Sequence, residues 1–279
     1  NLGCEPVRRL LEEVSMTLNE AQVTQAADLL AETFQARTTI DGLPESCAPA
    51  NAAEAVQVQV AMLERLGLEA SGYKAGFTNP PMLEKAGTDG PMAGVMFRDF
   101  TINSGGSLKR SDVGPGALIE AEVSFRMGAD LPAREGGYSE DEVIAAVDSA
   151  ILGIEFAVPR LSNPMGQPMV HLAADNGAAM AFVAGPDIPD WKNRDLKQLG
   201  IELLFDGGKV SEGMPLPARC DERWALTWTV NHFSARGIGI RAGDLITTGA
   251  AAAPVPLGAA KDVVARFDGV GDVHVTIEG

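Results

Sequence analysis

Three glutamates stand out because each lies in an otherwise apolar segment. Glu120 and Glu122 are two residues apart in Ala117–Phe125, and a β-strand would place both carboxylates on one face. Glu155 is the only charged residue between positions 150 and 159, where burying an unpaired carboxylate is costly. A strand with one solvated face explains the Glu120/Glu122 spacing without a metal. Together with Glu155, however, three convergent carboxylates favour a site for Mg²⁺ or Mn²⁺.

A lysine between small residues is the second chemical signal. Lys74 lies in Ser-Gly-Tyr-Lys-Ala-Gly-Phe-Thr, flanked by Gly72 and Gly76. Glycines permit close approach of backbone or ligand, and an ammonium near a metal can stabilise an enolate or pass a proton. A solvated surface lysine is the alternative interpretation.

The chain is strongly acidic. Its 279 residues include 22 Lys and Arg against 38 Asp and Glu, a formal net charge of −16 at pH 7. Such a charge repels nucleic-acid phosphates and anionic membrane surfaces, and no run of 18 apolar residues predicts a membrane span. Hydrophobic residues make up 46% of the chain, enough for a sizeable core. We expect a globular protein whose partner is a small molecule, not nucleic acid or membrane.

The cysteines and the amino-terminal residues indicate the cellular compartment in which the protein is expected. Cys4, Cys47 and Cys220 are scattered and form no C-x-x-C pair, so neither a zinc knuckle nor a redox motif is expected. The amino end lacks the basic and apolar regions of a secretory signal. Met16 begins a start-like Met-Thr-Leu-Asn-Glu, which would leave residues 1–15 as an upstream extension. Reduced thiols and a cytoplasmic location are the expectation.

The spacing of apolar residues divides the chain into a helical amino-terminal segment, residues 1–70, and a β-rich catalytic core, residues 71–279. The core is expected to form one structural unit. Apolar residues recur at helical spacing in the first part. In the second, short apolar runs separated by Gly and Pro predict strands at 94–97, 117–125, 181–183, 201–205, 244–248 and 273–277. Two helices are predicted among them, at 139–152, opened by a capping box of Ser139 and Glu142, and at 223–236. Helices followed by many strands indicate an α+β fold.

Five short motifs occur in an order that resembles one known family. They are Gly-Tyr-Lys-Ala-Gly-Phe-Thr at 72–78, Ile-Glu-Ala-Glu-Val at 119–123, Gly-Ile-Glu-Phe at 153–156, Ala-Asp-Asn at 174–176 and Ala-Gly-Asp-Leu-Ile-Thr-Thr-Gly at 242–249. From about residue 50 to its end, the chain is similar to the 2-hydroxypentadienoate (2-keto-4-pentenoate) hydratase / 4-oxalocrotonate decarboxylase family. That family is a branch of the fumarylacetoacetate hydrolase superfamily. Each motif is weak alone, and their shared order carries the resemblance.

The resemblance implies a mixed β-sheet roll or barrel core with helices packed outside, usually in oligomers. It implies a divalent metal, Mg²⁺ or Mn²⁺, held by Glu120, Glu122 and Glu155. The implied catalytic residues are Lys74 and Asp89, the latter in Thr88-Asp-Gly-Pro91. The implied substrate-binding residues are Thr248, Gly249, Asp175 and Asn176. Taken alone, Asp175-Asn176-Gly177 is typical of a turn.

These residues fit chemistry on a 2-oxo acid. Such a substrate chelates the metal through its carboxylate and 2-oxygen, and the metal acts as a Lewis acid that stabilises the enolate. Charge develops on that oxygen in the transition state, where a fixed cation and an ammonium contribute most. The implied activity is that of a hydro-lyase, which adds water to a 2-hydroxy-2,4-dienoate in the breakdown of aromatic compounds. Loss of CO₂ onto the same electron sink would instead give a carboxy-lyase.

Departures from the family pattern keep three hypotheses open. The family usually has an acid shortly after the third glutamate, which Ala157-Val158-Pro159-Arg160 lacks, and a hydroxyl expected after Asn176 is missing. The first hypothesis is the hydratase, and the second is a decarboxylase or C–C hydrolase of an oxo-diacid such as 4-oxalocrotonate. A diacid needs a second cationic anchor, for which the candidates are Arg98, Arg160 and Arg219.

The third hypothesis is a protein that binds 2-oxo acids without turnover. The grouping of Lys74 with three carboxylates argues against it, because a scaffold gains nothing from charges grouped so tightly. For any of the three we expect a homo-oligomer, and a partner enzyme of the same pathway is a further candidate partner.

Overall fold

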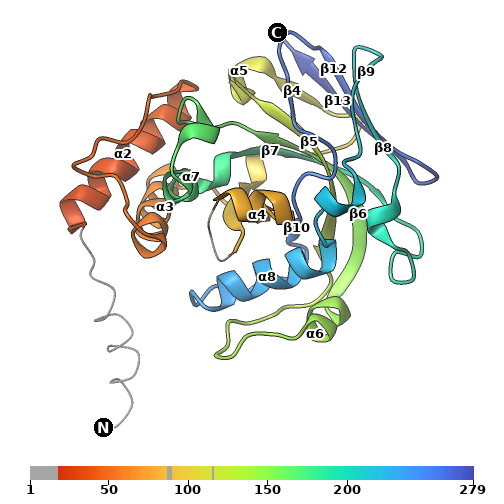
Figure 1. Cartoon of the computed structure of the whole chain (residues 1–279), viewed down its shortest axis with the longest axis horizontal. Coiled ribbons are helices and arrows are strands. Elements are labelled where there is room, and N and C mark those ends of the chain that lie inside the picture. The colour runs from red at the N-terminus through yellow and green to blue at the C-terminus, as the bar shows by residue number, and fades with distance from the viewer. Residues whose placement is uncertain (1–17, 87–89, 115) are drawn as a thin grey trace. The chain divides into compact units, whose positions relative to one another are not determined.

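The computed structural model describes residues 18–86, 90–114 and 116–279 (Figure 1). Cys4, Met16 and Asp89 lie outside these residues. Within them the chain forms two compact units: the amino-terminal helices up to Gly67 together with Arg160–Asp175, and the remainder, Leu68–Pro159 with Asn176–Gly279. Both β-sheets belong to the second unit.

The first unit is helical, as the amino-terminal sequence predicts. Helix α2 (Glu20–Ala36) begins at a capping box of Asn19 and Gln22, and α3 (Ala52–Leu66) begins at Asn51, whose side chain accepts from a backbone N–H. Helix α3 packs against both α2 and the short α7 (Met169–Ala174). The apolar residues buried in α2 and α3 include Ala26, Ala27, Leu30, Phe34, Ala55, Val58 and Met62.

Residues 160–175 belong to this helical unit, whereas the sequence placed them in the β-rich core. Ile40 forms a parallel bridge with Leu161, and the Arg160 Nε lies 2.5 Å from the Asp175 Oδ1. The Arg160 N–H donates to the second carboxylate oxygen of Asp175 at 2.8 Å. Pairings over such sequence distances leave no local periodicity, which is why the sequence texture does not reveal them.

The second unit is built on a mixed eight-stranded sheet. Seven strands follow the order β2-β1-β10-β5-β6-β7-β3, and β11 pairs with β5 beside this path. The strands are β1 (Ala70–Gly76), β2 (Met92–Phe97), β3 (Thr101–Asn103), β5 (Leu118–Met127), β6 (Val147–Ala157), β7 (Ala179–Asp187), β10 (Leu245–Thr247) and β11 (Val255–Pro256). β1 pairs with β10 in parallel and with β2 antiparallel. The long strands β5 and β6 bend strongly (Figure 1).

A second sheet of five strands completes this unit, in the order β4-β13-β12-β8-β9. Its strands are β4 (Ser107–Lys109), β8 (Ile201–Phe205), β9 (Gly208–Glu212), β12 (Asp262–Phe267) and β13 (Gly271–Glu278).

The helices are α4 (Pro80–Ala86), α5 (Arg110–Val113), α6 (Glu140–Ala145) and α8 (Glu222–Ser234), with short 3₁₀ turns η1 (Arg98–Phe100), η2 (Pro164–Gly166, in the first unit), η3 (Asn176–Ala178), η4 (Leu196–Gln198) and η5 (Leu216–Ala218). Helix α8 packs against β1, β5 and β10. The α+β fold with a curled mixed sheet and outer helices is confirmed.

The helix predicted over 139–152 is wrong for more than half its length. Its capping box at Ser139 and Glu142 is present, but α6 ends at Ala145. From Val147 the chain is strand β6, which is hydrogen-bonded to β5 on one edge and β7 on the other. All of its residues except Asp148 are buried. A strand buried on both faces is a continuous apolar run, which periodicity alone does not distinguish from a buried helix.

Within the described part of the chain, no helix has the length and apolarity needed to cross a membrane.

Candidate metal centre

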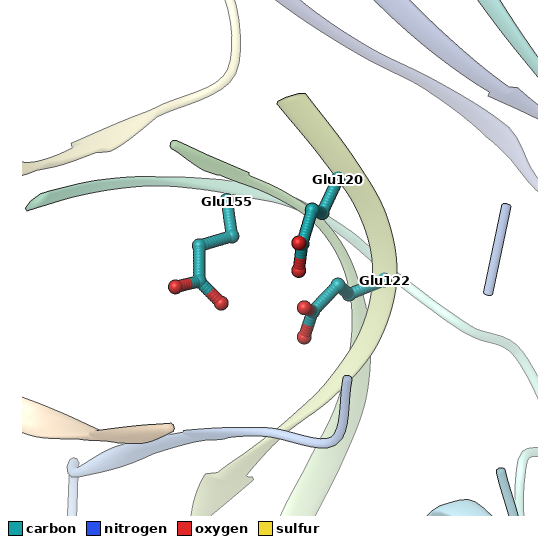
Figure 2. A group of neighbouring side chains, drawn as sticks. All are labelled: Glu120, Glu122 and Glu155. Carbon is teal, nitrogen blue, oxygen red and sulfur yellow. The ribbon is translucent and has the colours of Figure 1, made fainter. Parts of the chain in front are cut away.

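The three glutamates meet on neighbouring antiparallel strands. Register pairs Glu120 of β5 directly with Glu155 of β6, and Glu122 follows two residues along β5 on the same face. One carboxylate oxygen from each residue lies within 4.8 Å of the others. Figure 2 shows the three carboxylates pointing into one space inside the curve of the strands. This is the geometry the sequence predicts for a shared cation.

The three carboxylates carry more negative charge than the neighbouring ammonium of Lys74 compensates. Glu122 and Glu155 are buried and Glu120 is half-buried. Among the described residues, the Glu122 Oε1 and the Glu155 Oε2 have no hydrogen-bond partner. Since buried charges are otherwise paired or coordinate metals, these oxygens fit a divalent cation that prefers oxygen ligands.

The proton affinities of the carboxylates follow from the same crowding. Burial, followed by the charge of Glu155, raises the pKa of Glu120 to about 7. Burial and the charges of Glu155 and Glu120 raise the pKa of Glu122 well above its usual range. Both causes disfavour the charged form, and a bound cation would favour it instead.

Lys74 lies at this cluster and is buried, which excludes a solvated surface lysine. Its Nζ is 2.5 Å from the Glu155 Oε1 and donates to the Gly177 carbonyl oxygen at 2.9 Å. Burial acts to lower the pKa of Lys74, but the negative charges of Glu155 and Glu120 outweigh it and the pKa is raised. Lys74 is therefore held as an ammonium next to the candidate metal ligands.

The loop after β10 brings Gly249 to the same place. The Gly249 N–H donates to the Glu122 Oε2 at 3.0 Å. Gly249 has φ +100, and a Cβ there would lie 2.2 Å from the Thr78 Oγ1, so only glycine fits. The Thr78 hydroxyl donates to the Thr248 carbonyl at 2.7 Å, and the Thr248 hydroxyl donates to the Val123 carbonyl at 2.7 Å. Thr248 and Gly249 thus lie beside the carboxylate cluster, and their binding of substrate stays a prediction.

The remaining candidate residues have different surroundings. The Asn176 amide is bound to the backbone of Val95, and the carbonyl of the next residue, Gly177, accepts from Lys74. Asp175 belongs to the helical unit, where its carboxylate is paired with Arg160. Asp89 lies outside the described residues. The roles of Asp175 and Asn176 in substrate binding and of Asp89 in catalysis stay predictions.

Sequence reasoning missed one residue next to this site. Cys220 is buried near Thr78 and Thr248, and burial, followed by the charge of Glu222, raises the pKa of its thiol to about 12. Thr78 closes the first quoted motif, whereas a cysteine without a C-x-x-C or a nearby histidine carries no local signal.

Cys220 is expected to resist alkylation in the folded protein. A thiol with a pKa near 12 is almost entirely protonated at pH 8, and the thiolate is the nucleophile. Iodoacetamide followed by peptide mass spectrometry should label Cys220 only after denaturation. Labelling of the native protein at the rate of an exposed thiol would contradict this burial.

No family model matches the chain, but curated proteins and solved structures do. The chain is 26% identical over 260 residues to the 2-keto-4-pentenoate hydratase of Paraburkholderia xenovorans (strain LB400), covering 92% of this chain and 95% of the hydratase. It is 28% identical over 208 residues to the 4-oxalocrotonate decarboxylase of Pseudomonas sp. (strain CF600), covering 74% and 77% of the two chains.

Solved structures agree with these relatives. The 4-oxalocrotonate decarboxylase from Pseudomonas putida G7, complexed with magnesium and adipate, superposes with a TM-score of 0.82 at 26% identity, over 94% of this chain and 99% of that one. The fumarylpyruvate hydrolase from Pseudomonas aeruginosa, in complex with Mn²⁺ and pyruvate, shares the fold with a TM-score of 0.52 at 19% identity, over 76% and 90%.

The fold is thus that of the fumarylacetoacetate hydrolase superfamily. The names of these curated relatives, at 26% and 28% identity, confirm the resemblance of the five motifs to the 2-keto-4-pentenoate hydratase / 4-oxalocrotonate decarboxylase family.

Proposed function

We propose that the protein is a metal-dependent lyase that adds water to a 2-hydroxy-2,4-dienoate in the breakdown of aromatic compounds. The observation that carries this proposal is the placement of the Lys74 ammonium against three convergent carboxylates, two of them buried and one half-buried. The names of the hydratase and decarboxylase relatives support a lyase. The magnesium and Mn²⁺ complexes of the two structural neighbours support the choice of cation.

Each residue of the site has a distinct part in such a reaction. Glu120, Glu122 and Glu155 would hold Mg²⁺ or Mn²⁺, which supplies Lewis-acid stabilisation of negative charge on the substrate. The Lys74 ammonium faces the same space and stabilises charge that develops on the 2-oxygen of the acid. It also carries a proton that can be passed to or from the substrate. The Gly249 N–H holds Glu122 in place through its hydrogen bond.

An oxo-diacid needs a cationic side chain for its second carboxylate, and two of the three candidate arginines, Arg98 and Arg160, are already paired with carboxylates. This favours a monoacid substrate. Arg98 pairs with Glu69 at 3.0 Å, and both side chains are largely exposed. The third candidate, Arg219, donates to the backbone carbonyls of Lys197, Leu199 and Ala251 through its Nε and Nη1, whereas its buried Nη2 has no hydrogen-bond partner among the described residues. Arg160 lies in the helical unit and is paired with Asp175. Decarboxylation of an oxo-diacid is therefore the second candidate, favoured by the adipate complex of the decarboxylase, and binding without turnover is the third.

The protein loaded with Mg²⁺ or Mn²⁺ is expected to consume freshly generated 2-hydroxypenta-2,4-dienoate. The dienol absorbance should fall only with metal present, and NMR should identify a 4-hydroxy-2-oxo acid. The same protein treated with a chelator is the control. No consumption with the metal bound would reject hydration, and 4-oxalocrotonate would then be the substrate to test.

We place this reaction in the cytoplasm, in a homo-oligomer, with a pathway enzyme as a candidate partner. The buried unpaired thiols of Cys47 and Cys220 are consistent with a reducing compartment. Sedimentation of the purified protein tests the homo-oligomer.

A further inference from the structure

A short left-handed turn lies against Lys74. Asn176, Gly177 and Ala178 form η3 and have φ values of 52°, 60° and 60°. All three residues are buried. The left-handed region is unfavourable for an alanine, while asparagine and glycine tolerate it. Three such residues in succession persist only when their surroundings hold them in place.

The Asn176 side chain supplies one such constraint. Its Oδ1 accepts from the Val95 N–H at 2.8 Å, and its Nδ2 donates to the Val95 carbonyl at 2.9 Å. The amide therefore pairs with both backbone groups of one residue of β2, as a neighbouring strand would. Because the amide is wholly buried, losing these two bonds would leave polar backbone unpaired in the interior.

Close packing joins this turn to the strand that carries Lys74. Gly94 of β2 is the register partner of Lys74. A Cβ at Gly94 would lie 2.3 Å from the Asn176 carbonyl oxygen and 3.0 Å from the Lys74 Cγ. The turn, Gly94 and the stem of Lys74 thus occupy one tightly packed volume, in which a shift of the turn moves the neighbours of Lys74.

The turn also gives the Lys74 ammonium its neutral acceptor. The Nζ donates to the Gly177 carbonyl on one side and pairs with Glu155 on the other. Without the Gly177 carbonyl, the attraction of the three carboxylates would be unopposed and would draw the Nζ further into the cluster.

We propose that Asn176 is a positioning residue for Lys74: its amide fixes the left-handed turn on Val95, so that the Gly177 carbonyl holds the Nζ at the edge of the carboxylate cluster. In this role Asn176 supports the position of Lys74, which is distinct from the substrate contact that the sequence predicts for Asn176. The catalytic consequence depends on the proposed hydratase function, whereas the placement of Lys74 does not.

Two substitutions separate the amide from the backbone conformation. N176A removes the hydrogen bonds and adds left-handed strain, whereas N176G removes the hydrogen bonds and keeps the φ without strain. In the metal-loaded protein, both are expected to lower kcat by about 10- to 100-fold, the scale of a 1 Å misplacement. KM and the Mn²⁺ affinity measured by calorimetry should stay within about 2-fold. If N176A does not fold, N176G carries the test.

A matched control exists on the turn between β8 and β9. Asp206 is also left-handed, with φ 49, and its Oδ1 accepts from the N–H groups of Lys261 and Asp262 at 3.0 Å each. D206A thus removes two side-chain-to-backbone hydrogen bonds at a left-handed residue, as N176A does, but at a place that is not in contact with Lys74. It should leave kcat unchanged. An N176G protein with wild-type kcat would overturn the proposal, as would an equal loss in D206A.

A crystal structure of N176G reads the position of Lys74 without any turnover. The Nζ is expected beyond about 3.5 Å from the Gly177 oxygen, outside hydrogen-bond range. An Nζ that keeps this bond would overturn the proposal even if kcat falls. A wild-type protein without dienoate turnover would refute the hydratase function instead, and the crystal structure would still decide the role of Asn176.

Discussion

Replacing Glu155 or Glu120 by alanine is expected to abolish metal binding while the fold survives. Each residue contributes one oxygen to the group of three within 4.8 Å. Loss of residues that only orient ligands already costs about 10- to 100-fold in affinity, so loss of a ligand should weaken Mn²⁺ binding by at least about 100-fold. Calorimetric titration of each purified variant with Mn²⁺ measures this effect.

The fold should survive because neither substitution removes an apolar core side chain and each reduces repulsion between buried carboxylates. Thermal melting followed by circular dichroism checks this point. The matched control is E212A on β9, which removes an exposed glutamate paired only with Lys209 among the described residues, and it should bind Mn²⁺ like the wild type. Wild-type affinity in E120A and E155A would refute the assignment of metal ligands.

The clustering of the three candidate metal ligands was predictable from sequence because two features of it are local. The period of two along a strand places Glu120 and Glu122 on one face, and Glu155 stands out as a lone charge in an apolar run. The antiparallel register that sets Glu120 opposite Glu155 is a long-range pairing and leaves no trace in either segment. Before the structure, the two segments were linked only by the inference that three carboxylates in apolar surroundings share one cation and by the order of the five motifs.

The errors have the same origin. The capping box at Ser139 gave a correct helix start, but pairing with β5 and β7 determined that residues from Val147 onward form a strand. The bond of the Asn176 amide to Val95, 81 residues away in the chain, was likewise not foreseen, and the predicted substrate contact of Asn176 stays a prediction. Sequence reasoning detects which residues carry unusual chemistry, whereas contacts between distant segments decide which partner each residue meets.

Replacing Lys74 by methionine is expected to remove turnover and keep the metal. Methionine retains an apolar stem of similar length but lacks the ammonium, so charge on the substrate oxygen loses a fixed donor and a proton route is lost. Effects of this kind are about 100- to 10,000-fold in kcat. Metal affinity should be at least that of the wild type, because the substitution removes a competing cation 2.5 Å from the Glu155 Oε1.

Steady-state kinetics on the dienoate and calorimetry with Mn²⁺ on the same preparation separate the two effects. The control is K209M, which removes a half-exposed lysine that pairs with Glu212 at 3.0 Å on β9 and should change neither quantity. Loss of metal together with activity in K74M would mean that the buried ammonium stabilises the carboxylate cluster itself. Unchanged kcat would remove Lys74 from the mechanism, and the proposed role of Asn176 in turnover would fall with it. The reason is that the proposed effect of Asn176 on turnover acts through Lys74, which donates to the Gly177 carbonyl.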